Sequence, residues 1–274
     1  MAVSQASTAR GVLPGFGLTM GTTLTLLCLV VLIPLSTLVV KAAALTSGQF
    51  WAVVSSPRVV ASLKLTMGTS FVAALINSVF GLLAAWVLVR YSFPGRKWLD
   101  GIVDLPFALP TAVAGITLTT LYAPQGWLGK PLAALGIRAA YNPLGITIAL
   151  IFIGLPFVVR TLEPVLEDMD SDMEEAAATL GAGRWQTIRE VIFPVLVPPL
   201  LTGFTLAFAR ALGEYGSVVS GHIRGLTNTI PLHVEILYNE YSFAAAFAVA
   251  SLLALSSVVT LLLKFIVEKR AAQS

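Results

Sequence analysis

Six long stretches without a charged residue constrain the fold of this chain more than any other feature. They run over Gly11–Val40, Leu65–Val89, Leu105–Gly129, Ala139–Val159, Val191–Ala209 and Tyr241–Leu263. An α-helix needs about 20 apolar residues to cross the hydrocarbon core of a bilayer. Helices satisfy their own backbone hydrogen bonds in lipid, and none of the stretches alternates like a membrane β-strand. The sequence therefore predicts an all-α, polytopic membrane protein with six transmembrane helices.

The first stretch also resembles a cleaved signal peptide, because Arg10 precedes it and Ala42-Ala43-Ala44 follows it. Its apolar part, Leu18–Val40, has 23 residues, whereas the apolar region of a signal peptide has about 7–15. We therefore expect a retained membrane helix.

The composition agrees with a membrane protein and excludes other classes. Of the 274 residues, 57% are hydrophobic and 11% are charged, against about 25% charged in soluble domains. Such a chain is too apolar for a disordered protein or an ordinary soluble globule. A net charge of +3 on so apolar a chain does not predict a nucleic-acid partner. The single cysteine, Cys28, excludes a disulfide framework and a thiolate zinc site, and we expect no metal site.

The positions of Lys and Arg predict the orientation, because cytoplasmic loops carry an excess of both. With the N-terminus in the cytoplasm, ten basic residues lie on the inner side and six on the outer side, while Arg210 lies inside a helix. We therefore expect both termini to be cytoplasmic.

The segment Arg160–Pro194 between the fourth and fifth stretches is rich in acidic residues and holds eight of the chain's 14. Ser171 followed by Glu174 forms a capping-box pattern at a helix N-terminus. The run Glu175–Ala178 favours a helix, and Gly181 is well placed to end it in a left-handed conformation. The pattern predicts a short helix below the membrane.

A second helical stretch is expected over Trp185–Phe193, leading to Pro194 and the fifth membrane helix. Ala176 and Ala177 give the first helix small side chains, which would let a groove of another protein approach its backbone. From these patterns alone two interpretations stay open: a docking helix, or a solvated acidic connector.

Arg210 and Glu214 are the two charged residues expected inside the bilayer. Four positions apart, they share a helix face and can form an ion pair, and either charge alone would cost about 2.5–3.5 kcal/mol near the bilayer centre. The pair either faces a polar path through the membrane or an outer gate, or is a structural ion pair. Pro110 and Thr111 are further pathway candidates, because a proline can break a helix next to a binding site. Pro106 is expected at a helix start.

One motif resembles the EAA signature of ABC importer permeases. It consists of Glu175-Ala176-Ala177, then three residues, Gly181, nine residues and Val191–Pro194. Val191 and Phe193 replace the Ile and Leu of the family pattern. The resemblance implies the type I ABC importer transmembrane fold. It also implies that residues 172–181, with Glu174 and Glu175, form a coupling helix in a cleft of the ATP-binding subunit.

Three further segments are similar to the sulfate/thiosulfate permeases of this superfamily: Arg90–Arg96, Asp104–Gly115 and Phe204–Gly216. The Leu109-Pro110-Thr111 stretch resembles the T type rather than the W type. This resemblance implies the permease subunit of an ATP-driven sulfate/thiosulfate importer in a bacterial inner membrane. Its partners would be a W-type permease, two ATP-binding subunits and an external sulfate-binding protein.

The chain has no G-x-x-x-x-G-K-[ST] phosphate loop and no hydrolase motif. We therefore expect no catalytic residue and no cofactor here, with ATP and Mg bound by the partner subunit. The expected organisation is a tail, first helix and external loop over 1–62, a five-helix core over 63–267 and a cytoplasmic tail over 268–274. The alternatives are a molybdate/tungstate permease and an ATP-independent anion transporter.

Overall fold

The computed structural model describes residues 15–169, 172–219, 223 and 227–271, and every regular element in these ranges is a helix. The elements are α1 (Phe16–Leu27), η1 (Cys28–Leu32), α2 (Ile33–Ala42), α3 (Ser47–Val54), α4 (Pro57–Arg90), α5 (Arg96–Ala108), α6 (Thr111–Tyr122), α7 (Gly129–Ala134), α8 (Pro143–Glu167), α9 (Asp172–Thr179), α10 (Arg184–Thr187), η2 (Ile188–Ile192), α11 (Phe193–Leu212), α12 (Gly216–Val219), α13 (Ile230–Asn239) and α14 (Phe243–Ala271). The all-α prediction is confirmed.

Within the described residues, five helical segments are long and apolar enough to cross a membrane. They are Phe16–Ala42, Pro57–Arg90, Pro143–Glu167, Arg184–Leu212 and Phe243–Ile266. The pair α5 and α6 makes a sixth candidate span when its two helices are taken together, although they meet at an angle of 111°. Five predicted spans therefore correspond to continuous helical segments, and the third does not.

The predicted third span, Leu105–Gly129, is broken at Leu109 and Pro110. Helix α5 ends at Ala108, Leu109 is extended with φ −88° and ψ 135°, and α6 begins after Pro110. A residue before proline is pushed out of the helical region, because the proline ring clashes with its backbone. Pro106 lies inside the last turns of α5, so the expectation that it starts a helix is wrong.

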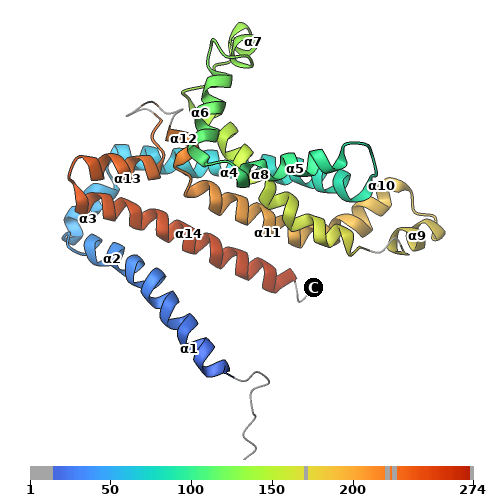
Figure 1. The fold of residues 1–274 in the computed structure, drawn as a ribbon, viewed down its shortest axis with the longest axis horizontal. Helices are drawn as coiled ribbons and strands as arrows, with labels where there is room; N and C mark the ends of the chain where they lie inside the picture. Colours follow the sequence, from blue (N-terminus) through green and yellow to red (C-terminus); the bar gives the residue numbers. More distant parts are fainter. Residues whose placement is uncertain (1–14, 170–171, 220–222, 224–226, 272–274) are drawn as a thin grey trace, which may run out of the picture.

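Helices α4, α8 and α11 run side by side and form the centre of the bundle (Figure 1). They approach closely through glycines: a Cβ on Gly81 of α4 would lie 2.7 Å from Val158 Cγ1 of α8. A Cβ on Gly203 of α11 would lie 3.0 Å from Val158 Cα. Small residues at such contacts let helix backbones pack tightly where lipid removes the hydrophobic driving force.

Asn77 of α4 is buried and inserts into the backbone ladder of α8. With its amide oriented to satisfy both neighbours, it donates to the Ile151 carbonyl at 3.0 Å and accepts from Leu155 N–H at 3.3 Å. Gly154 leaves room for it, because a Cβ there would overlap the Asn77 side-chain amide. These two bonds hold α4 against the middle of α8.

Two described helices contain a π-helical turn, and a proline follows each of them closely. The turn Cys28–Leu32 precedes Pro34, and the turn Ile188–Ile192 precedes Pro194. Proline cannot donate the usual hydrogen bond to the carbonyl four residues earlier, and a π turn shifts the bonding pattern around that gap.

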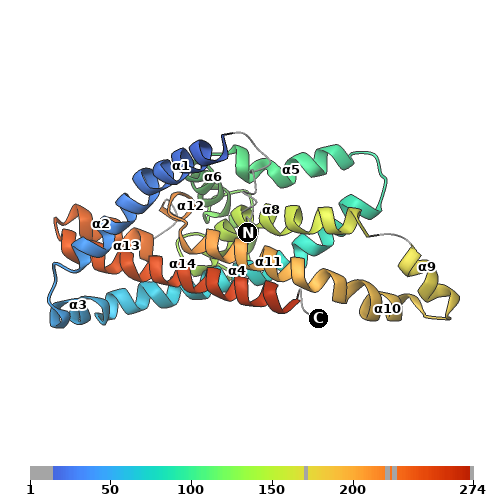
Figure 2. The same ribbon diagram turned by 90° about the horizontal axis from the view of Figure 1, so that it is seen from below.

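Helices α1 and α2 form a long arm beside the bundle (Figures 1 and 2). Of Phe16–Ala42, Ala42 is the one buried residue, although α2 contacts α14. The α6–α7 segment projects from the opposite side of the bundle (Figure 1). These two parts leave large apolar surfaces exposed.

Candidate functional site

Helix α9 lies at the end of the bundle where α4 and α8 finish (Figure 1). The helical run through α10 and η2 into α11 begins at the same end. It spans Asp172–Thr179, and Gly181 follows with φ +82°. Gly181 N–H donates to the Ala178 carbonyl and Ala182 N–H to the Ala177 carbonyl, both at 3.0 Å. These are the two bonds of a Schellman termination. The predicted short helix and its glycine stop are confirmed, whereas Ser171 lies outside the described residues.

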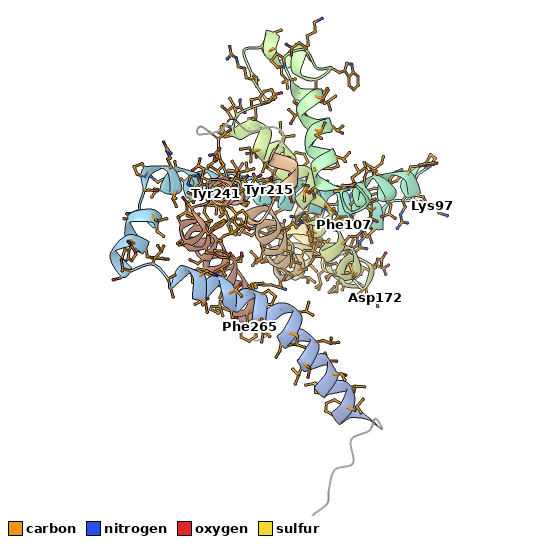
Figure 3. The ribbon with its side chains drawn as sticks, turned by 60° about the vertical axis from the view of Figure 1, so that its left-hand side comes forward. Lys97, Phe107, Asp172, Tyr215, Tyr241 and Phe265 are labelled. Carbon is orange, nitrogen blue, oxygen red and sulfur yellow. The ribbon has the colours of Figure 1, made fainter. Side chains whose placement is uncertain are left out.

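Glu174 ties α9 to the rest of the chain. Its Oε1 lies 2.9 Å from Nη2 of Arg90, the last residue of α4, and the Arg90 guanidinium also lies over the Trp86 ring, 5.5 Å from its centroid. Glu174 therefore faces the chain's own helices, while Glu175 is exposed. Figure 3 places Asp172, at the start of α9, on the same side of the molecule as Lys97.

The expected small-residue face of α9 is only half present. Ala176 is exposed, but Ala177 is buried within this chain. Consecutive residues of an α-helix point about 100° apart, so the two alanines cannot share a face. Leu180 beside Ala176 is 88% exposed. Glu175, Ala176 and Leu180 are thus among the exposed residues in and just after α9.

Pro194 lies where the helical stretch that follows α9 passes into α11. The helical segment Arg184–Leu212 is continuous from α10 through η2 into α11, and Pro194 occupies the first turn of α11. Because the helix runs through Pro194, its missing N–H donor is accommodated by the π turn at Ile188–Ile192. The predicted helical stretch over Trp185–Phe193 is therefore confirmed, and it is joined directly to the fifth span.

Arg210 and Glu214 form the predicted ion pair, with Nη1 and Oε2 2.5 Å apart. The helix ends at Leu212, two residues before Glu214. Glu214 is 3% exposed, and its Oε1 accepts from Ser217 N–H at 2.8 Å, at the start of α12. One carboxylate therefore joins the end of α11 to α12 and neutralises Arg210.

Thr111 lies against the same short helix. A Cβ on Gly216 would overlap Thr111 Oγ1, and a Cβ on Gly115 would overlap the carbonyl of Ser217. Pro110 is the N-cap residue of α6. The structure thus brings the four sequence-predicted pathway candidates into one neighbourhood, where the start of α6 meets the turn that follows α11.

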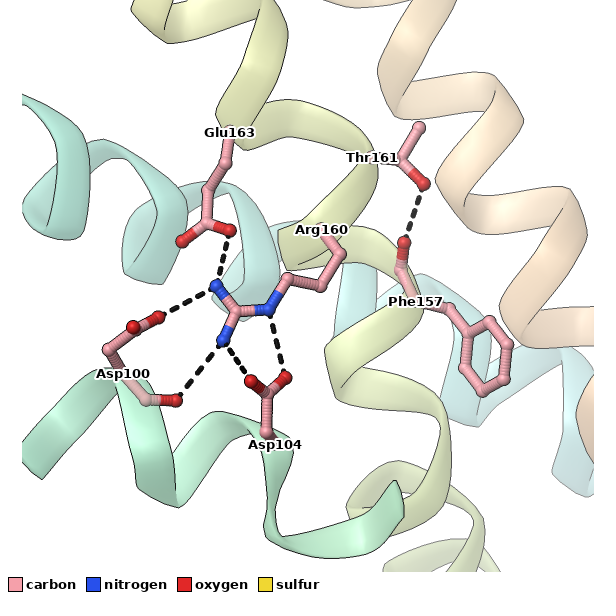
Figure 4. Close-up of polar contacts among 6 residues, drawn as sticks. All are labelled: Asp100, Asp104, Phe157, Arg160, Thr161 and Glu163. Carbon is pink, nitrogen blue, oxygen red and sulfur yellow. Dashed lines mark hydrogen bonds and ion pairs between the residues drawn. The ribbon is translucent and has the colours of Figure 1, made fainter. Parts of the chain in front are cut away.

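A cluster of four charged residues between α5 and α8 was not predicted; we call Asp100, Asp104, Arg160 and Glu163 the Arg160 cluster (Figure 4). Arg160 Nε and Nη2 donate to the two carboxylate oxygens of Asp104 at 2.9 and 2.6 Å. Arg160 Nη1 contacts Asp100 at 2.7 Å and Glu163 at 2.6 Å. The four-residue spacing of Asp100 and Asp104 was the available signal, because it places both carboxylates on one helix face.

No group of described residues could hold a metal ion. His233 of α13 is buried, and His222 lies outside the described residues.

The matching family model covers residues 77–273 and is described as the binding-protein-dependent transport system inner membrane component. The chain belongs to this family. Members of this permease family are non-catalytic membrane subunits of their transport systems, and the chain is a multi-pass inner-membrane protein.

Curated relatives of this permease are similar over most of its length. The sulfate transport system permease protein CysT of Escherichia coli K12 is 47% identical over 258 residues, covering 93% of each chain. The protein of the same name from Synechocystis is 45% identical over 243 residues, covering 88% of this chain and 85% of the relative.

Solved structures support the fold. The crystal structure of a bacterial ABC transporter that imports the acidic polysaccharide alginate matches with a TM-score of 0.74 and 17% identity, covering 94% of both chains. A complex of such a transporter with a pentasaccharide-bound periplasmic protein has the same score, with 19% identity. The chain therefore has the transmembrane fold of ABC importers.

Proposed function

We propose that this chain is the T-type permease subunit of an ATP-driven importer for sulfate and thiosulfate. The observation that carries the proposal is the 47% identity to a sulfate permease over 93% of both chains. A dianion cannot cross about 30 Å of hydrocarbon unaided, so its path must be lined by protein. This chain would supply one half of that lining and a second, W-type permease the other.

Coupling to the ATP-binding subunit is assigned to α9. Its exposed residues Glu175 and Ala176 would enter the cleft of that subunit. Glu174, Ala177 and Gly181 would act indirectly: Glu174 pairs with Arg90, Ala177 packs inward, and Gly181 ends the helix. Pro194 would begin the membrane helix that carries the movement.

The translocation pathway is assigned to the neighbourhood of Pro110, Thr111, Arg210 and Glu214. Because Glu214 is buried and paired with Arg210, the two charges largely cancel. A gate is therefore the better interpretation than a fixed anion site. The contact between Thr111 and Gly216 would close it, and the Arg210–Glu214 pair would hold α12 in place.

An importer of this kind would also define the partners, the orientation and the organisation of this chain. Two ATP-binding subunits would bind ATP and Mg, an external binding protein would deliver sulfate, and both termini of this chain would be cytoplasmic. Residues 63–267 would form the core, with residues 1–62 as a separate arm and 268–274 as a tail. The arm's exposed apolar surface agrees with a lipid or subunit environment.

Uptake of labelled sulfate tests the proposal. Cells lacking their own sulfate permease should regain uptake when this chain is expressed with its partner subunits. Vanadate should block that uptake, excess thiosulfate should compete, and an equal amount of molybdate should not. Failure to restore uptake would contradict the proposal that sulfate is the transported anion. Equal competition by molybdate would favour the molybdate/tungstate alternative.

A charge-reversal variant tests the proposed docking of α9 on the ATP-binding subunit. Glu175→Lys should abolish uptake while the protein reaches the membrane at its normal level. Glu240→Lys makes the same charge change at the far end of the bundle, after α13, and should retain uptake. Uptake that is unaffected by Glu175→Lys would contradict a docking role for α9.

A further inference from the structure

In the Arg160 cluster, four hydrogen bonds and a further ion pair hold one guanidinium. An arginine side chain has five N–H groups. Nε and one Nη2 proton go to Asp104, the second Nη2 proton goes to the Asp100 carbonyl at 3.2 Å, and Nη1 serves Asp100 and Glu163. The two parallel bonds to Asp104 form a fork that fixes direction as well as distance. Arg160 therefore holds α5 in one orientation on α8 (Figure 4).

The cluster is one of several contacts that hold α5 in place, and Val103 of α5 is buried in the core that α8 helps to form. Another is the edge-to-face contact of Phe107 with Phe157, with centroids 5.2 Å apart. Phe107 follows Asp104 by three residues and Phe157 precedes Arg160 by three, so the two contacts lie about one turn apart. Otherwise α5 packs on α8 far less extensively than α4 does. Arg160 thus carries much of the attachment of α5.

The position of this attachment along the chain suggests its purpose. Helix α8 ends at Glu167 and α9 begins at Asp172, so α9 closely follows, along the chain, the end of α8 that carries Arg160. Helix α5 leads through the bend at Leu109 and Pro110 to Thr111, which meets Gly216. Arg160 therefore joins the segment that ends in α9 to the segment that ends at Thr111.

We propose that Arg160 is a positioning residue that transmits movement of α9, through α8, to α5 and on to the contact between Thr111 and Gly216. The proposal rests on the coupling role of α9 given above. A salt bridge with a purely structural role would stabilise the protein without affecting how much transport each ATP supports. The two roles therefore differ in the ratio of sulfate transported to ATP hydrolysed.

The cluster offers a matched pair of variants. Asp104→Asn weakens the fork between α5 and α8, whereas Glu163→Gln weakens a bond between residues three apart on α8 itself. Both changes replace a carboxylate by an amide of the same shape. Arg160→Lys is the third variant, because it keeps the charge but cannot form the fork.

The test uses the whole importer in proteoliposomes, with its binding protein, and measures labelled sulfate uptake and ATP hydrolysis together. Asp104→Asn and Arg160→Lys should lower the ratio of uptake to hydrolysis severalfold. Glu163→Gln should keep the wild-type ratio.

Equal ratios in Asp104→Asn and Glu163→Gln would overturn the proposal. So would failure of both Asp104→Asn and Arg160→Lys to reach the membrane while Glu163→Gln does, because Arg160 would then be a folding contact. A wild-type complex without sulfate uptake would instead contradict the proposed function. Uptake that persists in Glu175→Lys would contradict the role of α9 alone.

Discussion

Arg90 and Glu174 form an ion pair that joins the end of α4 to α9, with Nη2 and Oε1 2.9 Å apart. Glu174→Gln should loosen α9 without removing its docking face. Because the pair is partly exposed, its loss should cost at most about 1 kcal/mol, or roughly a fivefold faster hydrogen exchange of the α9 amides. Glu175→Gln should leave that exchange rate unchanged, since Glu175 points outward. Equal exchange rates in both variants would contradict the assignment of the two glutamates.

The contact between α6 and α12 depends on glycine. Gly115→Ala places a methyl group against the Ser217 carbonyl, and Gly216→Ala places one against Thr111 Oγ1. Overpacking of this kind costs about 1–3 kcal/mol. Both variants should lower the thermal midpoint of the purified protein and reduce uptake. Gly213→Ala is the control, because nothing lies within 4 Å of its added Cβ; an equal loss there would contradict the close contact.

Asn77 bonds to α8, while its neighbour Ser78 bonds within its own helix, to the Ala74 carbonyl. Asn77→Ala should therefore destabilise the protein by about 1–3 kcal/mol, since buried backbone groups of α8 lose partners. Ser78→Ala should cost much less. Thermal unfolding in detergent measures both. An Asn77→Ala protein as stable as the Ser78→Ala protein would contradict the contact between Asn77 and α8.

His233 should make stability depend on pH. It lies in α13, outside the candidate spans, and burial lowers its pKa below the ordinary value, with the charge of Arg58 adding to the shift. Between this lowered pKa and about 6.5, the unfolded chain binds a proton that the folded chain excludes. Stability should thus be complete above about pH 7 and fall as the pH drops through 6.5, by at most about 1.4 kcal/mol per unit.

The thermal midpoint measured between pH 5 and 8 checks this dependence. His233→Gln should flatten the curve in the acidic range. A variant that keeps the full wild-type slope would show that other groups cause it.

Local spacing predicted the features that lie within one helix or one turn. Gly181, the Arg210–Glu214 pair and the helical stretch leading to Pro194 all depend on residues a few positions apart. The shape of α5 could not be predicted in this way. A search for uncharged runs begins at Leu105, whereas α5 begins at Arg96 and carries Asp100 and Asp104.

Those carboxylates are tolerated because Arg160, far away in the sequence, pairs with both. The Arg90–Glu174 pair was missed for the same reason: no local pattern connects the end of α4 with α9. Ala177 was assigned to a docking face, but its burial depends on tertiary packing that spacing does not reveal. Pairing across the fold thus decides which charges and small residues face outward.

Site-specific cross-linking at Ala176 tests the central claim most directly. Cys28 is the single cysteine, so a Cys28→Ala background allows a photo-cross-linker to be attached at Ala176→Cys in α9. Trp127→Cys provides a control on the projecting α6–α7 segment, where Trp127 is 82% exposed. In the assembled importer, we expect the Ala176 probe to capture the ATP-binding subunit and the Trp127 probe not to. Capture from Trp127 with none from Ala176 would contradict the account.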